Sequence, residues 1–261
     1  MQEEPLFSLV DIHSHILPGL DDGAQTIDES LAMLQLAAEN GTTDIVATPH
    51  ANSSYAYDVA VVERLIAEVT EEAGPLIRIH RGCDFHLNFD NLSKALENPH
   101  DYTVNSGRYL MVELPDLPSL PVMRTVLSRL LAVRVVPVIT HPERNGPLCA
   151  NLAELANWVR DGCLLQITAQ SFLGRFGPTA QRVAETLMNT GSVHFVASDA
   201  HDCVDRPPNL APAYQHVAQH WGQESADALF LDHPTAVVMD EPIFVAAPKP
   251  LKKASRFSFW K

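Results

Sequence analysis

Short apolar runs alternate with amphipathic stretches along most of the chain. In the amphipathic stretches, apolar residues recur every three or four positions, as on the buried face of a helix; Ile27, Leu31 and Leu34 are one such set. Thr26 and Glu29 form a capping box at the start of that stretch, which supports a helix there. This alternation of short apolar runs and helical stretches is typical of βα units around a parallel sheet.

The alternation predicts seven strands and the helices that separate them. Strands are expected at residues 8–12, 44–48, 76–80, 109–112, 135–139, 163–167 and 194–197. Helices are expected between residues 26 and 41 and over residues 58–73, 120–130, 152–160, 178–191, 209–220 and 224–231. No linker-like change in composition divides the chain, and single α/β barrels commonly reach this length. The predicted fold class is therefore α/β, a distorted parallel (β/α)7 barrel of the TIM type formed by residues 1–248.

Composition narrows the classes of function. Hydrophobic residues make up 46% of the chain, enough for a substantial core, and the formal net charge is -14. Nucleic acids and anionic membranes bind basic surfaces, so we expect neither to be the main partner. The most apolar stretch, residues 130–139, is too short to span a bilayer. The start of the chain is acidic and has no apolar signal-peptide segment, so a cytoplasmic location is expected.

The last thirteen residues differ from the rest of the chain. Residues 249–261 include five basic residues and no acidic one. A flexible, solvated tail is the simpler interpretation. The alternative is a basic and aromatic arm that contacts a partner or a membrane surface.

Metal-capable residues follow six of the seven predicted strands. They are His13 and His15 after the first strand, His50 after the second, Asp84 after the third, Glu113 after the fourth, His141 after the fifth, and Asp199 and His201 after the seventh. The carboxyl ends of the strands form one face of a parallel barrel, so these residues should converge although they are far apart in sequence. Residues two apart in an extended chain project to the same side, which pairs His13 with His15 and Asp199 with His201. Asp22, in the turn at residues 21–23, is placed to reach the same face.

The mixture of imidazoles and carboxylates suits Mn, Fe or Zn, whereas an all-oxygen set would favour Mg or Ca. The other histidines are expected to be ordinary surface or core residues: His80, His100, His194, His216, His220 and His233. His86 lies two residues after Asp84, and a role in supporting a ligand is left open for it.

Five sequence segments carry a resemblance to one protein family. They are DIHSHILPGLDDGA at residues 11–24, IVATPH at 45–50, MVELP at 111–115, PVITHPERN at 137–145 and VASDAHDCVDRPP at 196–208. In this order they resemble the PHP superfamily, named for polymerase and histidinol phosphatase. Within it, the opening segment and THPERN are similar to those of the manganese-dependent bacterial protein-tyrosine phosphatases of capsule and exopolysaccharide loci, the CpsB/CapC-like family.

The resemblance implies a cluster of two or three divalent ions, with Mn²⁺ expected first and Fe or Zn as alternatives. Position by position, it implies three ligand sets: His13, His15 and Asp199; Glu113 and His141; and Asp22, His50 and His201. Relatives usually have Glu at the position that bridges the first two ions, where this chain has the shorter Asp84. Arg144 and Arg206 match the family's phosphate-binding arginines.

The resemblance also implies a function, the hydrolysis of phosphotyrosine. The implied substrate and partner is the tyrosine-rich tail of a bacterial tyrosine kinase that controls polysaccharide export. A metal-activated hydroxide would attack phosphorus while Arg144 and Arg206 hold the equatorial oxygens. Two other classes stay open: a small-molecule phosphomonoesterase of the histidinol-phosphate phosphatase type, and a non-catalytic binding module on the same barrel. Assembly into a homo-oligomer is also left open.

The cysteines exclude a cysteine-based phosphatase. That mechanism requires an arginine six positions after the nucleophilic cysteine, so that the thiolate lies in the phosphate cradle. The residues at those positions are Phe89, Leu155, Ala169 and Asn209. The four cysteines also lack CxxC spacing, which favours reduced thiols over a disulfide framework or a zinc ribbon.

Overall fold

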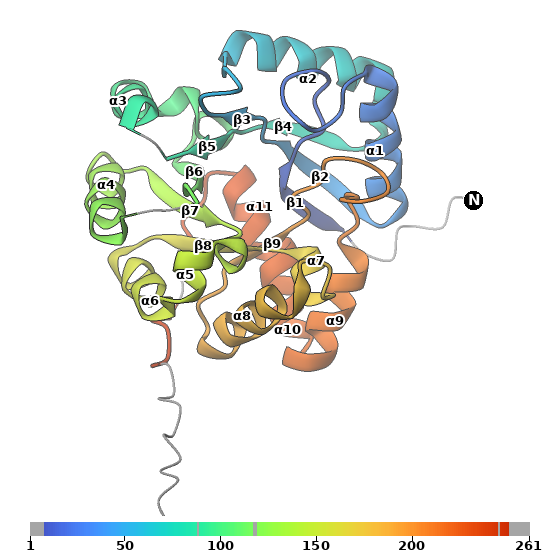
Figure 1. The fold of residues 1–261 in the computed structure, drawn as a ribbon. Coiled ribbons are helices and arrows are strands. Elements are labelled where there is room, and N and C mark those ends of the chain that lie inside the picture. Colours follow the sequence, from blue (N-terminus) through green and yellow to red (C-terminus); the bar gives the residue numbers. More distant parts are fainter. Residues whose placement is uncertain (1–7, 88, 117–118, 245, 251–261) are drawn as a thin grey trace, which may run out of the picture.

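Parallel strands lie at the centre of the molecule, nine of them among the residues that the structure describes, and helices surround them (Figure 1). The structure, a computed structural model, describes residues 8–87, 89–116, 119–244 and 246–250. Within these residues the strands are β1 (Leu9–Ser14), β2 (Thr42–Ala47), β3 (His50–Ala51), β4 (Arg78–Arg81), β5 (Asp84–His86), β6 (Tyr109–Glu113), β7 (Val136–Thr140), β8 (Leu164–Thr168) and β9 (Phe195–Ala197). They form two sheets, with the strand orders β1-β2-β4 and β3-β5-β6-β7-β8-β9.

The two sheets join into a ring of seven strand paths. β3 continues the path of β2, and β5 continues the path of β4, because only two residues separate the members of each pair. On the other side of the ring β9 meets β1, where a parallel bridge pairs Ser14 with Ala200 and the His15 N–H donates to the Ala200 carbonyl at 2.8 Å. This ring confirms the predicted seven-stranded parallel α/β barrel, in a distorted form.

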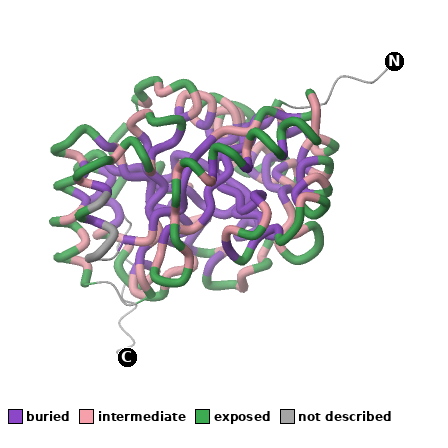
Figure 2. The backbone as a smooth tube through the Cα atoms, turned by 90° about the horizontal axis from the view of Figure 1, so that it is seen from above, coloured by how far each residue is buried: buried purple, intermediate pink, exposed green. Residues whose placement is uncertain are grey.

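The helices cover the outside of the ring and one of its ends. The longer ones are α1 (Ile27–Glu39), α2 (Val59–Ala73), α3 (Phe89–Glu97), α4 (Leu120–Ala132), α6 (Leu152–Asp161), α8 (Gly177–Thr190) and α9 (Ala211–Trp221). The shorter ones are α5 (Gly146–Cys149), α7 (Ala169–Phe172), α10 (Gln223–Asp227) and α11 (His233–Val238). Val237 of α11 packs with Val10 and Tyr109 inside the ring, so α11 closes its amino-terminal end. Buried residues concentrate at the centre of the molecule, and the exposed ones lie on the outer turns of the helices (Figure 2).

Apolar and polar side chains divide the inside of the barrel between its two ends. The amino-terminal half is filled by an apolar cluster that includes Val10, Val46, Met111, Val138, Leu164 and Phe195. Side chains alternate between the two faces of a strand, so Gln166 and Thr168 follow Leu164 on the inner face of β8. Both are fully buried, and polar groups therefore gather at the carboxyl-terminal end.

Local sequence signals explain where the first helices begin. The hydroxyl of Thr26 accepts from the Glu29 N–H at 3.2 Å, and the Glu29 carboxylate accepts from the Gln25 N–H at 2.7 Å, one residue before the cap. Asp58 caps α2 in the same way, accepting from the Ala60 N–H at 2.9 Å. Each cap satisfies backbone donors that have no partner inside the helix.

One helix was not predicted, and two predicted elements differ from the structure. The helix α3 was not predicted, because Leu92, Ala95 and Leu96 are too few apolar residues to set up a helical period. The strand expected at residues 76–80 begins only at Arg78, because Gly74–Leu76 forms a 3-10 turn. The helix expected at 224–231 is instead α10 followed by a π-helical turn at Ala228–Asp232.

No helix within the described ranges is both long and apolar enough to cross a bilayer. The predicted tail begins at Lys249, whose N–H donates to the Thr190 carbonyl at 2.8 Å. From Leu251 onward that tail lies outside the described residues.

Candidate metal centre

All nine residues predicted as metal ligands lie together at the carboxyl ends of the strands. They form four overlapping groups, in each of which the potential ligand atoms lie within 4.8 Å of one another. The groups are His15, Asp22, His50 and His201; His13, His15 and Asp84; His13, His141 and Asp199; and His50, Asp84 and Glu113. The structure therefore brings together residues that are separated by up to 188 positions in the sequence, from 13 to 201.

The imidazoles of His13, in β1, and His15, directly after β1, face one carboxylate from the loop after β9. The Nε2 atoms of His13 and His15 lie 3.6 Å and 3.5 Å from the same oxygen, Asp199 Oδ1, and 3.3 Å from each other. Ligand atoms bound about 2.1 Å from one ion lie roughly 3.0 to 3.5 Å apart. The spacing of these three atoms therefore matches a set of ligands around a common cation.

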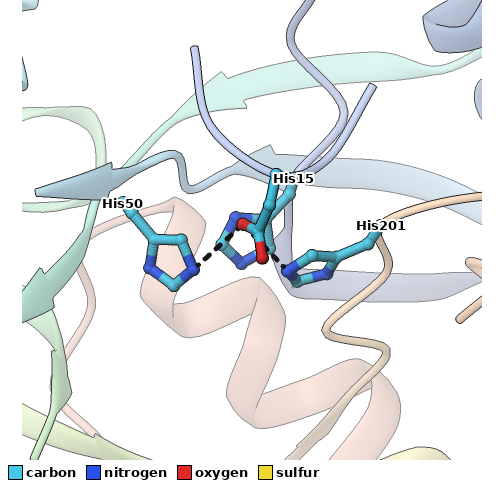
Figure 3. A group of neighbouring side chains, drawn as sticks. His15, His50 and His201 are labelled. Carbon is cyan, nitrogen blue, oxygen red and sulfur yellow. Dashed lines mark ion pairs between the residues drawn. The ribbon is translucent and has the colours of Figure 1, made fainter. Parts of the chain in front are cut away.

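A second set has the same spacing on the other side of His15. The Oδ1 atom of Asp22 lies 3.4 Å from His50 Nε2 and 3.5 Å from His201 Nε2. Figure 3 shows His15, His50 and His201 gathered around these two ion pairs, although they come from three different parts of the chain. The ring centroids of His15 and His201 are only 3.9 Å apart, so an imidazole of the first set packs directly against an imidazole of the second.

Asp84 lies between these sets, and Glu113 and His141 lie beside it. The Oδ2 atom of Asp84 is 3.1 Å from His50 Nδ1 and 3.6 Å from His13 Nε2. Glu113 completes the rim, with Oε2 at 3.6 Å from His50 Nδ1 and Oε1 at 3.9 Å from His141 Nε2. The central position of Asp84 is the one expected for a bridging carboxylate.

The donor set fits divalent cations. Asp84 is fully buried; its Oδ2 atom pairs with the imidazoles of His50 and His13, and its Oδ1 atom has no hydrogen-bond partner among the described residues. A buried carboxylate is costly unless it is paired or coordinates a metal. Imidazole nitrogens and carboxylate oxygens converging at these distances are the ligands that Mn, Fe and Zn accept.

The charges around Asp84 show which interactions a bound cation would replace. Burial alone would raise the pKa of Asp84, but His13 and His50 hold that pKa well below its usual range. Burial likewise opposes the charged form of His50, yet Asp22 and Asp84 raise its pKa to about 11. A proton on His50 thus offsets the negative charge of Asp22 and Asp84, and a metal ion would compete with that proton for the His50 imidazole.

Asp21 and Gln166 orient two of the imidazoles from outside the cluster. The Oδ2 atom of Asp21 lies 2.7 Å from His15 Nδ1 and accepts from the His50 N–H at 3.0 Å. The Oε1 atom of Gln166 lies 3.1 Å from His13 Nδ1. Such partners fix the tautomer and the orientation of a ligating imidazole. Sequence reasoning assigned neither residue a role: Asp21 stands beside the predicted ligand Asp22, and Gln166 belongs to the one strand expected to contribute nothing.

Backbone geometry at the strand ends also aims the ligands. His141 and Asp199 have positive φ angles of 34° and 53°, a left-handed conformation that is uncommon outside glycine. The Asp199 N–H donates to the His13 carbonyl at 2.9 Å, which stabilises this turn against β1. Unusual backbone conformations of this kind concentrate at functional sites.

Gly23 allows the turn of Asp21 and Asp22 to close over β1. A Cβ atom at position 23 would lie 2.0 Å from the His15 carbonyl oxygen, closer than any side chain can approach. The Gly23 N–H donates to Asp21 Oδ1 at 3.0 Å. Glycine is therefore required for the contact that brings both aspartates to the histidines.

The two predicted phosphate-binding arginines meet at Asp199. Arg206 reaches Asp199 Oδ2 at 2.5 Å, and Arg144 forms an ion pair with the same oxygen. The other oxygen of Asp199 faces the imidazoles, so this residue joins the arginines to the cluster. Burial and the charge of Arg144 lower the pKa of His141 to about 4, which keeps that imidazole neutral and able to accept a cation.

The remaining histidines separate into one that supports the cluster and six that do not contribute to it. His86 Nδ1 lies 3.3 Å from Glu113 Oε2, so His86 supports a cluster residue. None of the six predicted to be ordinary belongs to any of the four groups within the described ranges. His80, for example, contacts Asp44 at 2.9 Å near the amino-terminal end of the barrel.

A parallel barrel that presents imidazoles and carboxylates at the carboxyl ends of its strands defines a protein of the metal-dependent hydrolase class. Comparison with known proteins assigns it to a family. The family model described as capsular polysaccharide synthesis, CpsB/CapC, matches residues 9–239, so the chain belongs to the CpsB/CapC family.

Named relatives support this assignment over almost their full length. The tyrosine-protein phosphatase CpsB of Streptococcus pneumoniae is 31% identical over 244 residues, which cover 90% of this chain and 100% of that protein. The tyrosine-protein phosphatase YwqE of Bacillus subtilis is 30% identical over 258 residues, covering 97% and 100%. A crystal structure from the pair YwqE and CpsB, described as unique metal-dependent tyrosine phosphatases, matches with a TM-score of 0.85 and 28% identity, covering 94% of this chain and 100% of that one.

Proposed function

We propose that this chain is a metal-dependent protein-tyrosine-phosphate phosphatase. The observation that carries the proposal is the convergence of nine ligand-type side chains on one rim, with two arginines bound to one of them. Similarity to relatives named tyrosine-protein phosphatases supports the reaction and the substrate class.

The residues would hold two or three divalent ions, with Mn²⁺ expected and Fe or Zn as alternatives. We assign His13, His15 and Asp199 to one ion, Glu113 and His141 to another, and Asp22, His50 and His201 to a third, with Asp84 as the bridging ligand. Bound ions of this kind lower the pKa of water and supply hydroxide near neutral pH. Three divalent cations against four carboxylates would leave a local charge of about +2, which attracts a phosphate dianion despite the acidic exterior.

Arg144 and Arg206 would bind the phosphate in this proposal. Each guanidinium now shares one oxygen of Asp199, and each presents several planar N–H donors that match phosphate oxygens. A phosphate at the cluster would accept hydrogen bonds from both. Asp199 would then be released from the arginines and remain with the imidazoles of His13 and His15.

The physiological substrate in this proposal is the tyrosine-rich tail of a bacterial tyrosine kinase that controls polysaccharide export, encountered in the cytoplasm. The family's place in capsular polysaccharide synthesis supports this choice. A tyrosyl leaving group, with a pKa of about 10, is also easier to expel than an alkoxide.

The test is phosphatase activity after removal and return of metal. The chelated protein should lose hydrolysis of a phosphotyrosyl peptide and regain it with Mn²⁺, and His141→Ala should lower activity at least about a hundredfold. His220→Ala, which changes an exposed histidine of α9, is the matched control. Faster turnover of histidinol phosphate than of the peptide would favour the small-molecule phosphatase instead, and equal activity in His141→Ala and the parent would remove the site assignment.

A further inference from the structure

Arg144 separates two cavities on this face of the molecule. The smaller, of about 130 Å³, is lined by the cluster residues Glu113 and His141. The larger, of about 610 Å³, lies between α5 and the start of α8 and includes none of the nine cluster residues. Arg144 lines both cavities, so a molecule bound by this arginine at the cluster has the larger cavity next to it.

The larger cavity, which we name the Phe176 cavity, has mostly apolar walls. The lining residues are Gly146, Cys149, Ala150, Phe176, Thr179 and Ala180, together with two charged residues, Glu143 and Arg144. Small residues leave this space open: a Cβ atom at Gly146 would meet no other heavy atom within 4 Å. The volume lies within the range of about 300 to 1,000 Å³ that is usual for ligand pockets and exceeds what one aromatic ring needs.

Phe176 connects the cavity to the cluster through Arg144. The Arg144 guanidinium lies 4.3 Å from the centroid of the Phe176 ring, a cation–π contact, and the same guanidinium pairs with Asp199. Arg175, next to Phe176, reaches Asp205 at 2.7 Å and so links this wall to the loop that carries Arg206. The wall of the cavity therefore contacts Arg144 directly and is linked to the loop of Arg206 through the ion pair of Arg175 with Asp205.

We propose that the Phe176 cavity is a subsite for an apolar side chain next to the phosphotyrosine of a polypeptide substrate. This inference rests on the proposed phosphatase function. A phosphate held by Arg144 and Arg206 lies next to this cavity, and the substrate backbone is one tyrosyl side chain away from that phosphate. Neighbouring residues of an extended peptide are about 3.5 Å apart, so a side chain that flanks the phosphotyrosine can reach the cavity. Apolar walls favour an apolar side chain and disfavour a charged one, which would lose its hydration there.

The test compares substrates and cavity-filling variants of the metal-loaded, full-length protein. Substrates are p-nitrophenyl phosphate and two phosphotyrosyl peptides with either Leu or Gly on both sides of the phosphotyrosine. Thr179→Trp and Ala150→Trp place an indole in the cavity from exposed positions on its rim. Thr125→Trp is the matched control, because Thr125 is an exposed residue on a similar cavity of about 630 Å³ that contains no cluster residue.

In the parent, kcat/KM for the Leu-flanked peptide should exceed that for the Gly-flanked peptide about tenfold. The two cavity-filling variants should lose this preference, and their ratio of kcat/KM for the Leu-flanked peptide to that for p-nitrophenyl phosphate should fall about tenfold. Thr125→Trp should keep the parent's ratios. The proposal is overturned if both cavity-filling variants keep the Leu preference, or if turnover of p-nitrophenyl phosphate and of the peptide falls equally. A parent that hydrolyses none of these substrates would refute the proposed function itself, which is a separate result.

Discussion

Asp21 offers a sharp test of how the cluster is organised, because it touches two cluster residues without belonging to any of the four groups. One of its oxygens contacts His15 Nδ1 at 2.7 Å and accepts from the His50 N–H at 3.0 Å; the other accepts from the Gly23 N–H at 3.0 Å. All three contacts require an acceptor. Asp21→Asn keeps the shape of the side chain but turns one of the two oxygens into a donor.

Either orientation of the asparagine amide leaves a conflict. If the NH₂ group faces His15, it also faces the His50 N–H, so two donors oppose each other. His15 must then carry its proton on Nε2, the atom that faces Asp199, instead of on Nδ1. If the NH₂ group faces Gly23, two donors oppose each other in the turn that carries Asp22. The charge of Asp21, which helps raise the pKa of His15 to about 9 against the effect of burial, is lost in both cases.

Loss of a partner of this kind typically lowers metal affinity tenfold to a hundredfold, or about 1.4 to 2.7 kcal/mol. Mn²⁺ binding to the chelated protein, followed by calorimetry, measures this directly and does not depend on turnover. Asp58→Asn is the matched control, because Asn caps a helix as well as Asp does and Asp58 belongs to none of the four groups. Unchanged Mn²⁺ affinity in Asp21→Asn would refute the reasoning.

Three further predictions concern Asp84, Gly23 and the buried residue His194. Asp84→Ala should lower the number of Mn²⁺ ions bound per chain, measured by elemental analysis, by about one, and an unchanged number would exclude Asp84 as a central ligand. Gly23→Ala should destabilise the protein by about 2 kcal/mol or more in urea unfolding, because the new methyl group would overlap the His15 carbonyl; wild-type stability would show that the turn adapts. Burial, with a smaller effect of His233, lowers the pKa of His194 to about 3, so the unfolded chain binds the proton first and stability falls as the pH drops below about 6.5. Between pH 7 and pH 5 the parent should lose about 2 kcal/mol more stability than His194→Gln, and equal losses would contradict this assignment.

The cluster was predictable because the carboxyl ends of the strands of a parallel barrel lie on one face. Applying this rule requires only the positions of the strands in the sequence. His13, Glu113 and His141 each follow an apolar run, and the carboxyl ends of such runs meet whatever the details of the helices between them. The barrel itself was predictable for the same reason. The spacing of apolar residues along the chain shows where strands and helices alternate.

The parts that were not predicted depend on contacts between distant segments. Gln166 looks like any polar residue in the sequence until β8 is placed beside His13. Asp21 and Asp22 are adjacent carboxylates, and only the fold shows that one orients His15 while the other faces His50 and His201. Likewise, the pairing of both arginines with Asp199 arises from two loops separated by more than fifty residues.

The most direct test of the account is the ion content of the full-length protein after saturation with Mn²⁺ and removal of excess metal. The account predicts about two to three ions per chain, reduced in His13→Ala and unchanged in His220→Ala. Substantially fewer than two ions per chain in the parent, or equal contents in the parent and His13→Ala, would contradict it.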